Sequence, residues 1–101
     1  MRVTSRMCSI ISAFDGKARI DVDERSLSCE ERNKVFVLEF PKTINHLGNT
    51  FKVEEVSFNN LHGLGSSVTF PKLKKVRCPK DTLYGFTRWC LEDKSIAVEE
   101  Y

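Results

Sequence analysis

The sequence predicts a β-rich α/β fold: a short repeat solenoid with parallel strands, turn or 3₁₀ segments, and a short C-terminal capping helix. Between residues 35 and 86, two apolar residues flanking a polar one recur three times, as in short strands with one apolar face. These pairs begin at Leu38, Val56 and Val76, and the offsets of 18 and 20 residues lie near the short end of known repeat units. Two apolar residues three positions apart follow each pair, a spacing typical of a helical or 3₁₀ turn.

The turn segments form the second half of each copy. Their apolar pairs are Ile44 with Leu47, Leu61 with Leu64, and Leu83 with Phe86. Gly48 and Gly65 follow two of these pairs, where a chain that leaves a helical turn often needs a positive φ. A unit this small cannot bury its apolar edge alone, so we expect the copies to stack on one another.

Two stretches of this pattern resemble a known family. They are Leu38-Glu39-Phe40-Pro41-Lys42 followed by Ile44-Asn45-His46-Leu47-Gly48, and Leu73-Lys74-Lys75-Val76-Arg77-Cys78-Pro79-Lys80. The pattern is similar to the BspA-like class of leucine-rich repeats. The resemblance implies a protein-binding solenoid, with cell-surface or adhesion roles in some members. The alternative is an ordinary β-rich or α+β domain whose strands are evenly spaced.

Length and composition indicate a single domain over residues 1–101, with an N-terminal cap region (1–34), a repeat-like core (35–86) and a C-terminal cap (82–101). Hydrophobic content of 41% and charged content of 30% are typical of an ordered globular domain. Because the net charge is only +2, neither nucleic acid nor an anionic membrane is required as a partner. No apolar run is long enough to span a bilayer, so we expect no membrane insertion.

The N-terminal region is expected to be a hairpin or a divergent cap over the open end of the solenoid. An Asp-Gly turn signal at 15–16 is followed by alternating apolar and charged residues over 17–22. A cap is expected because an exposed strand edge promotes aggregation. Ser28 and Glu31 then have the spacing of a helix capping box.

Three core strands are predicted over 35–40, 52–58 and 73–78. The first is the strongest, because alternate residues from Phe36 to Phe40 form a fully apolar face. If the second and third strands stack in parallel, the acids at 54–55 lie near the lysines at 74–75. Such pairs of opposite charge would help to fix the register.

The C-terminal stretch predicts a short amphipathic helix over Thr82 to Leu91, with Asp81 at the N-cap. Ile96 and Val98 predict a final edge strand, and residues 99–101 are expected to fray.

Cysteine usage favours a reducing compartment. Cys8, Cys29, Cys78 and Cys90 permit two disulfides in any of three pairings, but no pair has the spacing of a zinc or redox motif. Cys78 occupies an apolar repeat position, which favours a buried thiol. The mildly apolar stretch 7–14 lacks a signal-peptide cleavage site. We therefore expect four free thiols and a cytoplasmic location, with the cell surface as the location that the resemblance implies for some members.

No pattern in the sequence indicates catalysis, so we expect a protein that is not an enzyme and has no cofactor. His46 and His62 fall at near-equivalent repeat positions, but a column of polar residues explains them without a metal. No local motif places Cys78 in the electropositive, accessible setting of a reactive thiol. The glycine-rich stretch 63–67 lacks the P-loop lysine and the dinucleotide pattern, so it is interpreted as a turn.

The expected function is a non-enzymatic protein–protein interaction, with an unidentified protein as the partner. The candidate binding residues on the repeat strand face are Glu39, Ser57, Lys74, Lys75 and Arg77. Arg88 and Trp89 form a second candidate contact, together with Tyr84, because such residues are favoured at interface hot spots.

Two further modes of association are considered from the sequence. The alternative function is a basic nucleic-acid-binding domain that uses the cluster at 72–80, although the acids at 54–55 would offset part of its charge. Self-association is expected if the end of the solenoid is uncapped.

Overall fold

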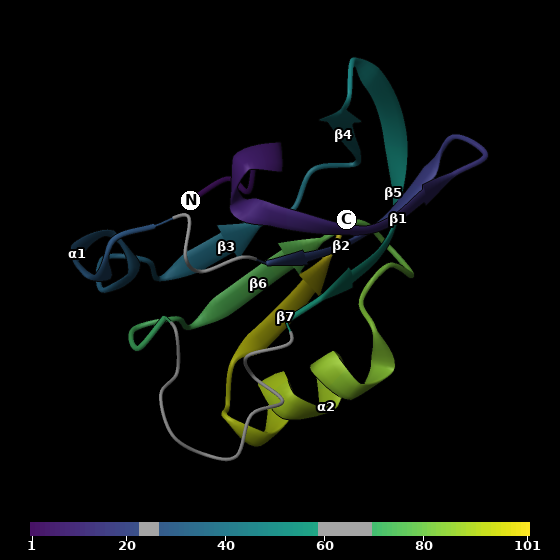
Figure 1. Cartoon of the computed structure of the whole chain (residues 1–101). Helices are drawn as coiled ribbons and strands as arrows, with labels where there is room; N and C mark the ends of the chain where they lie inside the picture. Colours follow the sequence, from purple (N-terminus) through teal and green to yellow (C-terminus); the bar gives the residue numbers. More distant parts are fainter. Residues whose placement is uncertain (23–26, 59–69) are drawn as a thin grey trace.

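The computed structural model describes residues 1–22, 27–58 and 70–101, which form two β-sheets with short helical segments around them (Figure 1). The larger sheet has four strands in the order β1-β2-β5-β4, and the smaller has three in the order β3-β6-β7. The elements are η1 (Ser5–Met7), β1 (Cys8–Phe14), β2 (Lys17–Val22), α1 (Cys29–Arg32), β3 (Val37–Glu39), β4 (Thr43–His46), β5 (Asn49–Ser57), β6 (Lys75–Cys78), α2 (Gly85–Asp93) and β7 (Ala97–Glu100).

Two antiparallel hairpins form the larger sheet. β1 pairs with β2 across Asp15-Gly16, which confirms the predicted N-terminal hairpin, and β4 pairs with β5 across Leu47-Gly48. All four turn residues have positive φ, from 50° to 80°, as in a two-residue type I′ turn. Gly48 thus has the φ expected from the sequence, but for a different reason. The predicted helical turn over Ile44 and Leu47 is wrong, because this segment is strand β4 and the start of the turn.

The remaining strand pairings are parallel. β2 and β5 join the two hairpins, with Ile20 opposite Val56. In the smaller sheet Leu38 on β3 lies opposite Val76 on β6, and Val76 lies opposite Val98 on β7. β7 confirms the predicted final strand, and it lies at an edge of this sheet.

The predicted solenoid of three stacked copies is wrong. Leu38 and Val76 are paired in the smaller sheet, but Val56 belongs to β5 of the larger sheet, where it pairs with β2. The cause is the Leu47-Gly48 turn, which returns the chain antiparallel to β4 and makes β5 part of a hairpin. The molecule is therefore a small β-rich domain with one mixed sheet and one parallel sheet. The second predicted turn pair, Leu61 with Leu64, lies outside the described residues, as does Gly65.

Both sheets contribute to one hydrophobic core. Ile20 and Val56 of the larger sheet and Leu38 and Val76 of the smaller are fully buried. Phe40, also fully buried, packs its ring against Phe58 with 5.5 Å between the ring centroids. Other core residues are Val3, Ala18, Val53, Phe70, Leu73, Cys78, Leu91 and Ile96. The prediction that Cys78 is buried is confirmed.

Both predicted helix signals correspond to helices. At α1, Ser28 Oγ accepts from the Glu31 amide at 3.1 Å and Glu31 Oε1 accepts from the Ser28 amide at 3.2 Å, so the capping box is confirmed. α2 begins later than predicted, because residues 82–84 bond to the edge of β5: the Val56 amide donates to the Thr82 carbonyl and the Tyr84 amide donates to the Val56 carbonyl. Asp81 is therefore not the N-cap.

Among the described residues, no helix has both the length and the apolar character needed to cross a bilayer. α2 has nine residues and lies on the opposite side of the molecule from the tip of the β4–β5 hairpin (Figure 1). The fold positions its candidate sites on the outer face of the smaller sheet, on the exposed side of α2, and in two surface cavities.

Candidate functional site

Alternating charges cross the outer face of the smaller sheet. Glu39, Arg77 and Glu99 are register partners on β3, β6 and β7. Arg77 Nη1 makes an ion pair with Glu39, and Arg77 Nε lies 3.0 Å from Glu99 Oε1. Lys75 Nζ also contacts Glu99. Arg2 forms a parallel bridge beside Glu39, so positive and negative side chains alternate over the whole width of this face.

The opposite charges of these side chains largely neutralise one another. The hydrogen bonds that Lys75 and Arg77 donate to Glu99 hold the pKa of its carboxyl below the usual value. Donation to Glu99 likewise raises the pKa of the Arg77 guanidinium, against an opposing effect of desolvation. A partner that bound Glu39, Lys75 or Arg77 through charge would have to break these pairs. The arrangement therefore favours a role in sheet register over one in recognition.

The other residues of the predicted strand face lie elsewhere. Ser57 is buried at the end of β5, where its hydroxyl donates to Asp21 Oδ1 at 3.4 Å. Lys74 is exposed, immediately before β6. The structure thus brings Glu39, Lys75 and Arg77 together but separates Ser57 from them.

The predicted charge pairing between the acids at 54–55 and the lysines at 74–75 is also wrong. Glu54 Oε2 lies 3.9 Å from Arg19 Nε of the neighbouring strand β2, and Lys75 pairs with Glu99. The reason is the same as for the solenoid: these segments belong to different sheets.

The last residues of the chain are held in place, contrary to the predicted fraying. The Tyr101 hydroxyl donates to the Phe40 carbonyl, and the Tyr101 amide donates to the Cys78 carbonyl at 3.0 Å. The guanidinium of Arg77 lies 5.2 Å from the centroid of the Tyr101 ring. Burial is the main cause of the raised pKa of the Tyr101 hydroxyl. The Tyr101 ring thus lies beside Arg77, near the carboxyl ends of β3 and β6.

The basic cluster at 72–80 is divided by the structure. Lys72, Lys74 and Lys80 are exposed, whereas Lys75 and Arg77 are engaged with acidic residues across the sheet. A nucleic-acid phosphate would have to compete with those acids, which weakens the support for a nucleic-acid interface at this cluster.

The exposed side of α2 carries two stacked aromatic rings. Trp89 is 60% exposed and Phe86 is 47% exposed, and their rings stack with centroids 5.8 Å apart and an interplanar angle of 16°. Tyr84, at the N-cap position, is also exposed. Arg88 does not extend this surface freely, because its Nη2 lies 2.8 Å from Glu100 Oε1 of β7. We call Tyr84, Phe86 and Trp89 the aromatic face.

Sequence reasoning identified Tyr84, Arg88 and Trp89 but missed Phe86, which was assigned to an inward repeat position. The helix buries Thr87, Cys90 and Leu91, so residues at Phe86 and Trp89 face the other way. The three-residue spacing of Phe86 and Trp89 already places both on one stripe of the predicted helix, but the sequence pattern also paired Phe86 with Leu83 as an apolar turn residue.

The described residues offer little support for catalysis or metal binding. Burial is the main cause that raises the pKa of the Cys78 thiol, so this cysteine is poorly suited to act as a thiolate nucleophile. In the ranges 1–22, 27–58 and 70–101, no group of three or more His, Cys, Asp or Glu side chains is placed to hold a metal ion. His46 is half-buried beside Phe51, with 6.3 Å between ring centroids, while His62 and the stretch 63–67 lie outside the described residues.

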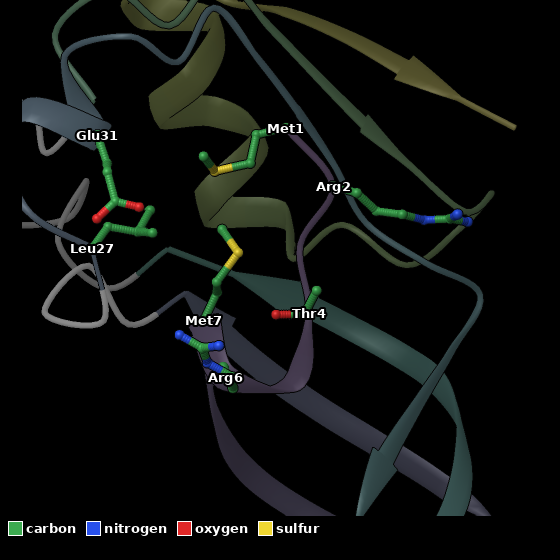
Figure 2. A pocket seen from close by; sticks show the side chains of 7 residues that line it. All are labelled: Met1, Arg2, Thr4, Arg6, Met7, Leu27 and Glu31. Carbon is green, nitrogen blue, oxygen red and sulfur yellow. The ribbon is translucent and has the colours of Figure 1, made fainter.

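One surface cavity, of about 330 Å³, lies between the N-terminal segment and α1. Figure 2 shows the side chains of Met1 and Met7 near its centre, whereas that of Arg2 extends away from it. Glu31, also in its lining, is engaged in the α1 capping box. The lining combines three apolar side chains with Arg2, Thr4, Arg6 and Glu31, and this mixture does not indicate a particular ligand.

A second cavity, of about 300 Å³, lies beside the start of β2 and is lined by Lys17, Lys52, Val53, Glu54, Lys80, Asp81 and Thr82. We call it the lysine pocket. Its residues come from three separate parts of the chain. Neither Lys17 nor Lys52 was predicted from the sequence to be a site residue.

No family model, curated protein or solved structure matches this chain. The resemblance to BspA-like repeats therefore stays a prediction, and the functional conclusion depends on the geometry described above.

Proposed function

We propose that this protein is a non-enzymatic protein-interaction module whose contact surface is the aromatic face of α2. The observation that carries the proposal is the stacked pair of Phe86 and Trp89, two large rings that the fold leaves about half exposed. Tryptophan and tyrosine are enriched among the residues that contribute most to binding at protein interfaces. Their rings bury a large apolar area with little loss of side-chain freedom.

The charges near the aromatic face define the partner further. Asp93 is exposed and lies four residues after Trp89, so it continues the same stripe of the helix. A partner that fits this stripe has an apolar groove for the two rings and a basic residue at the groove rim that faces Asp93. Arg88 supports the surface from the side through its ion pair with Glu100 and is not expected to contact the partner directly.

Other exposed aromatic residues provide matched controls. Phe14 lies at the tip of the β1–β2 hairpin and Phe36 precedes β3, and both are exposed like the aromatic face but lie outside α2. If binding is nonspecific and depends only on exposed apolar side chains, all of these positions should contribute equally to partner affinity. If α2 carries a specific binding surface, only the residues of α2 should contribute.

The test is site-specific photo-crosslinking. A benzophenone amino acid is placed at position 89 in one sample and at position 36 in another, and each is irradiated in an extract of the source cells. We expect a discrete adduct from position 89 and none from position 36. The crosslinked protein is then purified and its affinity measured with the unlabelled chain.

For that purified partner, Trp89→Ala and Phe86→Ala should each lower affinity about 30-fold or more, as expected for hot-spot residues. Phe36→Ala should leave affinity unchanged. Equal crosslinking from both positions, or an affinity that is unaffected by Trp89→Ala, would contradict the proposed surface.

A further inference from the structure

The lysine pocket combines like charges that the fold does not neutralise. Lys17 and Lys52 are register partners on the parallel strands β2 and β5, and both side chains are exposed on the same face of the sheet. Neighbouring strands lie about 4.8 Å apart, and like charges directly opposite one another destabilise a sheet.

The acid on the same strand as Lys52 does not relieve this repulsion. Glu54, two residues further along β5, makes its ion pair with Arg19. Among the described residues, no carboxylate lies within ion-pair distance of Lys17, Lys52 or Lys80. The three ammonium groups around the pocket are thus left to solvent or to a ligand.

The loop that carries Lys80 is fixed before any ligand arrives. The Lys80 amide donates to the Tyr101 carbonyl at 2.9 Å, and the Asp81 amide donates to Glu100 Oε1 at 3.3 Å. Thr82, which is buried, donates its hydroxyl to the Pro79 carbonyl at 2.6 Å. Hydrogen bonds therefore hold the loop of Lys80 where it lines the same pocket as Lys17 and Lys52, an arrangement that reduces the entropy lost on binding.

We propose that the lysine pocket binds a small phosphate monoester that also carries hydroxyl groups. A phosphate monoester has a charge near −2 and three strong acceptor oxygens, which suit three ammonium donors. The carboxylates of Glu54 and Asp81, also in the lining, accept hydrogen bonds from the hydroxyl groups of the ligand. A volume of about 300 Å³ limits the ligand to a compact molecule.

The experiment uses the full chain and isothermal titration calorimetry at constant ionic strength. The probes are glycerol 3-phosphate, inorganic phosphate and glycerol, applied to the unaltered protein and to Lys17→Gln, Lys52→Gln and Lys72→Gln. Lys72 is an exposed lysine outside the pocket and serves as the matched control.

We expect saturable binding of glycerol 3-phosphate, weaker binding of inorganic phosphate and none of glycerol. Lys17→Gln and Lys52→Gln should each weaken the binding of glycerol 3-phosphate at least tenfold, and Lys72→Gln should not change it. Without ligand, Lys52→Gln should raise Tm because it removes the repulsion, and glycerol 3-phosphate should no longer raise the Tm of that variant.

Three results would overturn the proposal. The first is no saturable binding of either phosphate compound, and the second is equal loss in Lys72→Gln and Lys52→Gln, which would show a general charge effect. The third is equal affinity for the two phosphate compounds, which would remove the hydroxyl requirement. None of these measurements involves the aromatic face, so the outcome is independent of the proposed protein interaction.

Discussion

Leu47 is held in a backbone conformation that leucine disfavours, and replacing it by asparagine should stabilise the protein. Leu47 is the first residue of the β4–β5 turn, with a φ of 50°, and its side chain is 86% exposed. The equivalent residue of the β1–β2 turn is Asp15, with a φ of 55°. Asparagine and aspartate adopt this left-handed region far more readily than leucine does.

The expected gain follows from the strain alone. The left-handed conformation costs an L-residue roughly 1–2 kcal/mol, and Leu47→Asn should recover about 1 kcal/mol of it. Because the Leu47 side chain is almost fully exposed, little packing is lost. For a domain of this size, about 1 kcal/mol corresponds to a rise in Tm of about 4–8 °C.

The assay is urea unfolding followed by circular dichroism, with the midpoint raised and the slope m unchanged. Leu47→Ala is the control, because alanine removes the exposed apolar side chain but keeps the strained Cβ, so its free energy of unfolding should stay within about 0.5 kcal/mol of the original. The reciprocal change, Asp15→Leu, should lower stability by about 1 kcal/mol. If Leu47→Ala stabilised the protein as much as Leu47→Asn, exposure of the side chain and not φ would be the cause, and the reasoning would be refuted.

Three other predictions concern the core, the ion pairs of Glu99 and the thiols. Leu38→Ala should lower the free energy of unfolding by about 2–5 kcal/mol in the same urea assay, because Leu38 is fully buried; a loss below about 1 kcal/mol would contradict its central place. Since the folded pKa of Glu99 lies below its unfolded value, its stabilising contribution is complete above about pH 4.3 and is lost as pH falls through the folded pKa. Glu99→Gln should therefore be less stable than the unaltered protein at neutral pH, with a difference that shrinks in acid; a constant difference down to pH values well below the usual glutamate pKa would argue against the ion pairs. Iodoacetamide should alkylate exposed Cys29 well before buried Cys78, whose pKa is raised. Mass spectrometry of tryptic peptides measures the order, and faster alkylation of Cys78 would contradict this prediction.

Local patterns in the sequence predicted most strands and the N-terminal hairpin, but not how the later strands pair. Alternation of apolar and polar residues around Leu38, Val56 and Val76 predicted three strands correctly. Alternation shows that one face of a strand is buried, but it does not show which strand lies beside it. Pairing is decided by turns, and the Leu47-Gly48 turn was open to two interpretations. A glycine with positive φ suits both the end of a helical turn and a two-residue hairpin, so the sequence did not distinguish them.

The candidate surfaces show the same limit. Trp89 was predicted as a contact residue from its type, whereas Phe86 was paired with Leu83 as a turn residue. Which side of α2 faces the core depends on the hydrogen bonds of residues 82–84 to Val56, a contact distant in the sequence. Lys17 and Lys52 likewise become neighbours only through the parallel register of β2 and β5, which no local pattern encodes.

Trp89 offers the most direct test of the central claim that α2 carries the binding surface. It is the single tryptophan of the chain, so emission excited at wavelengths that tyrosine does not absorb reports on this residue, and the partner's own emission is subtracted in the complex. The free protein should emit like a solvent-exposed indole and be quenched readily by acrylamide, and the purified crosslinking partner should shift the emission to shorter wavelength and protect it from quenching. Saturation with that partner without any change in emission or quenching would contradict the claim.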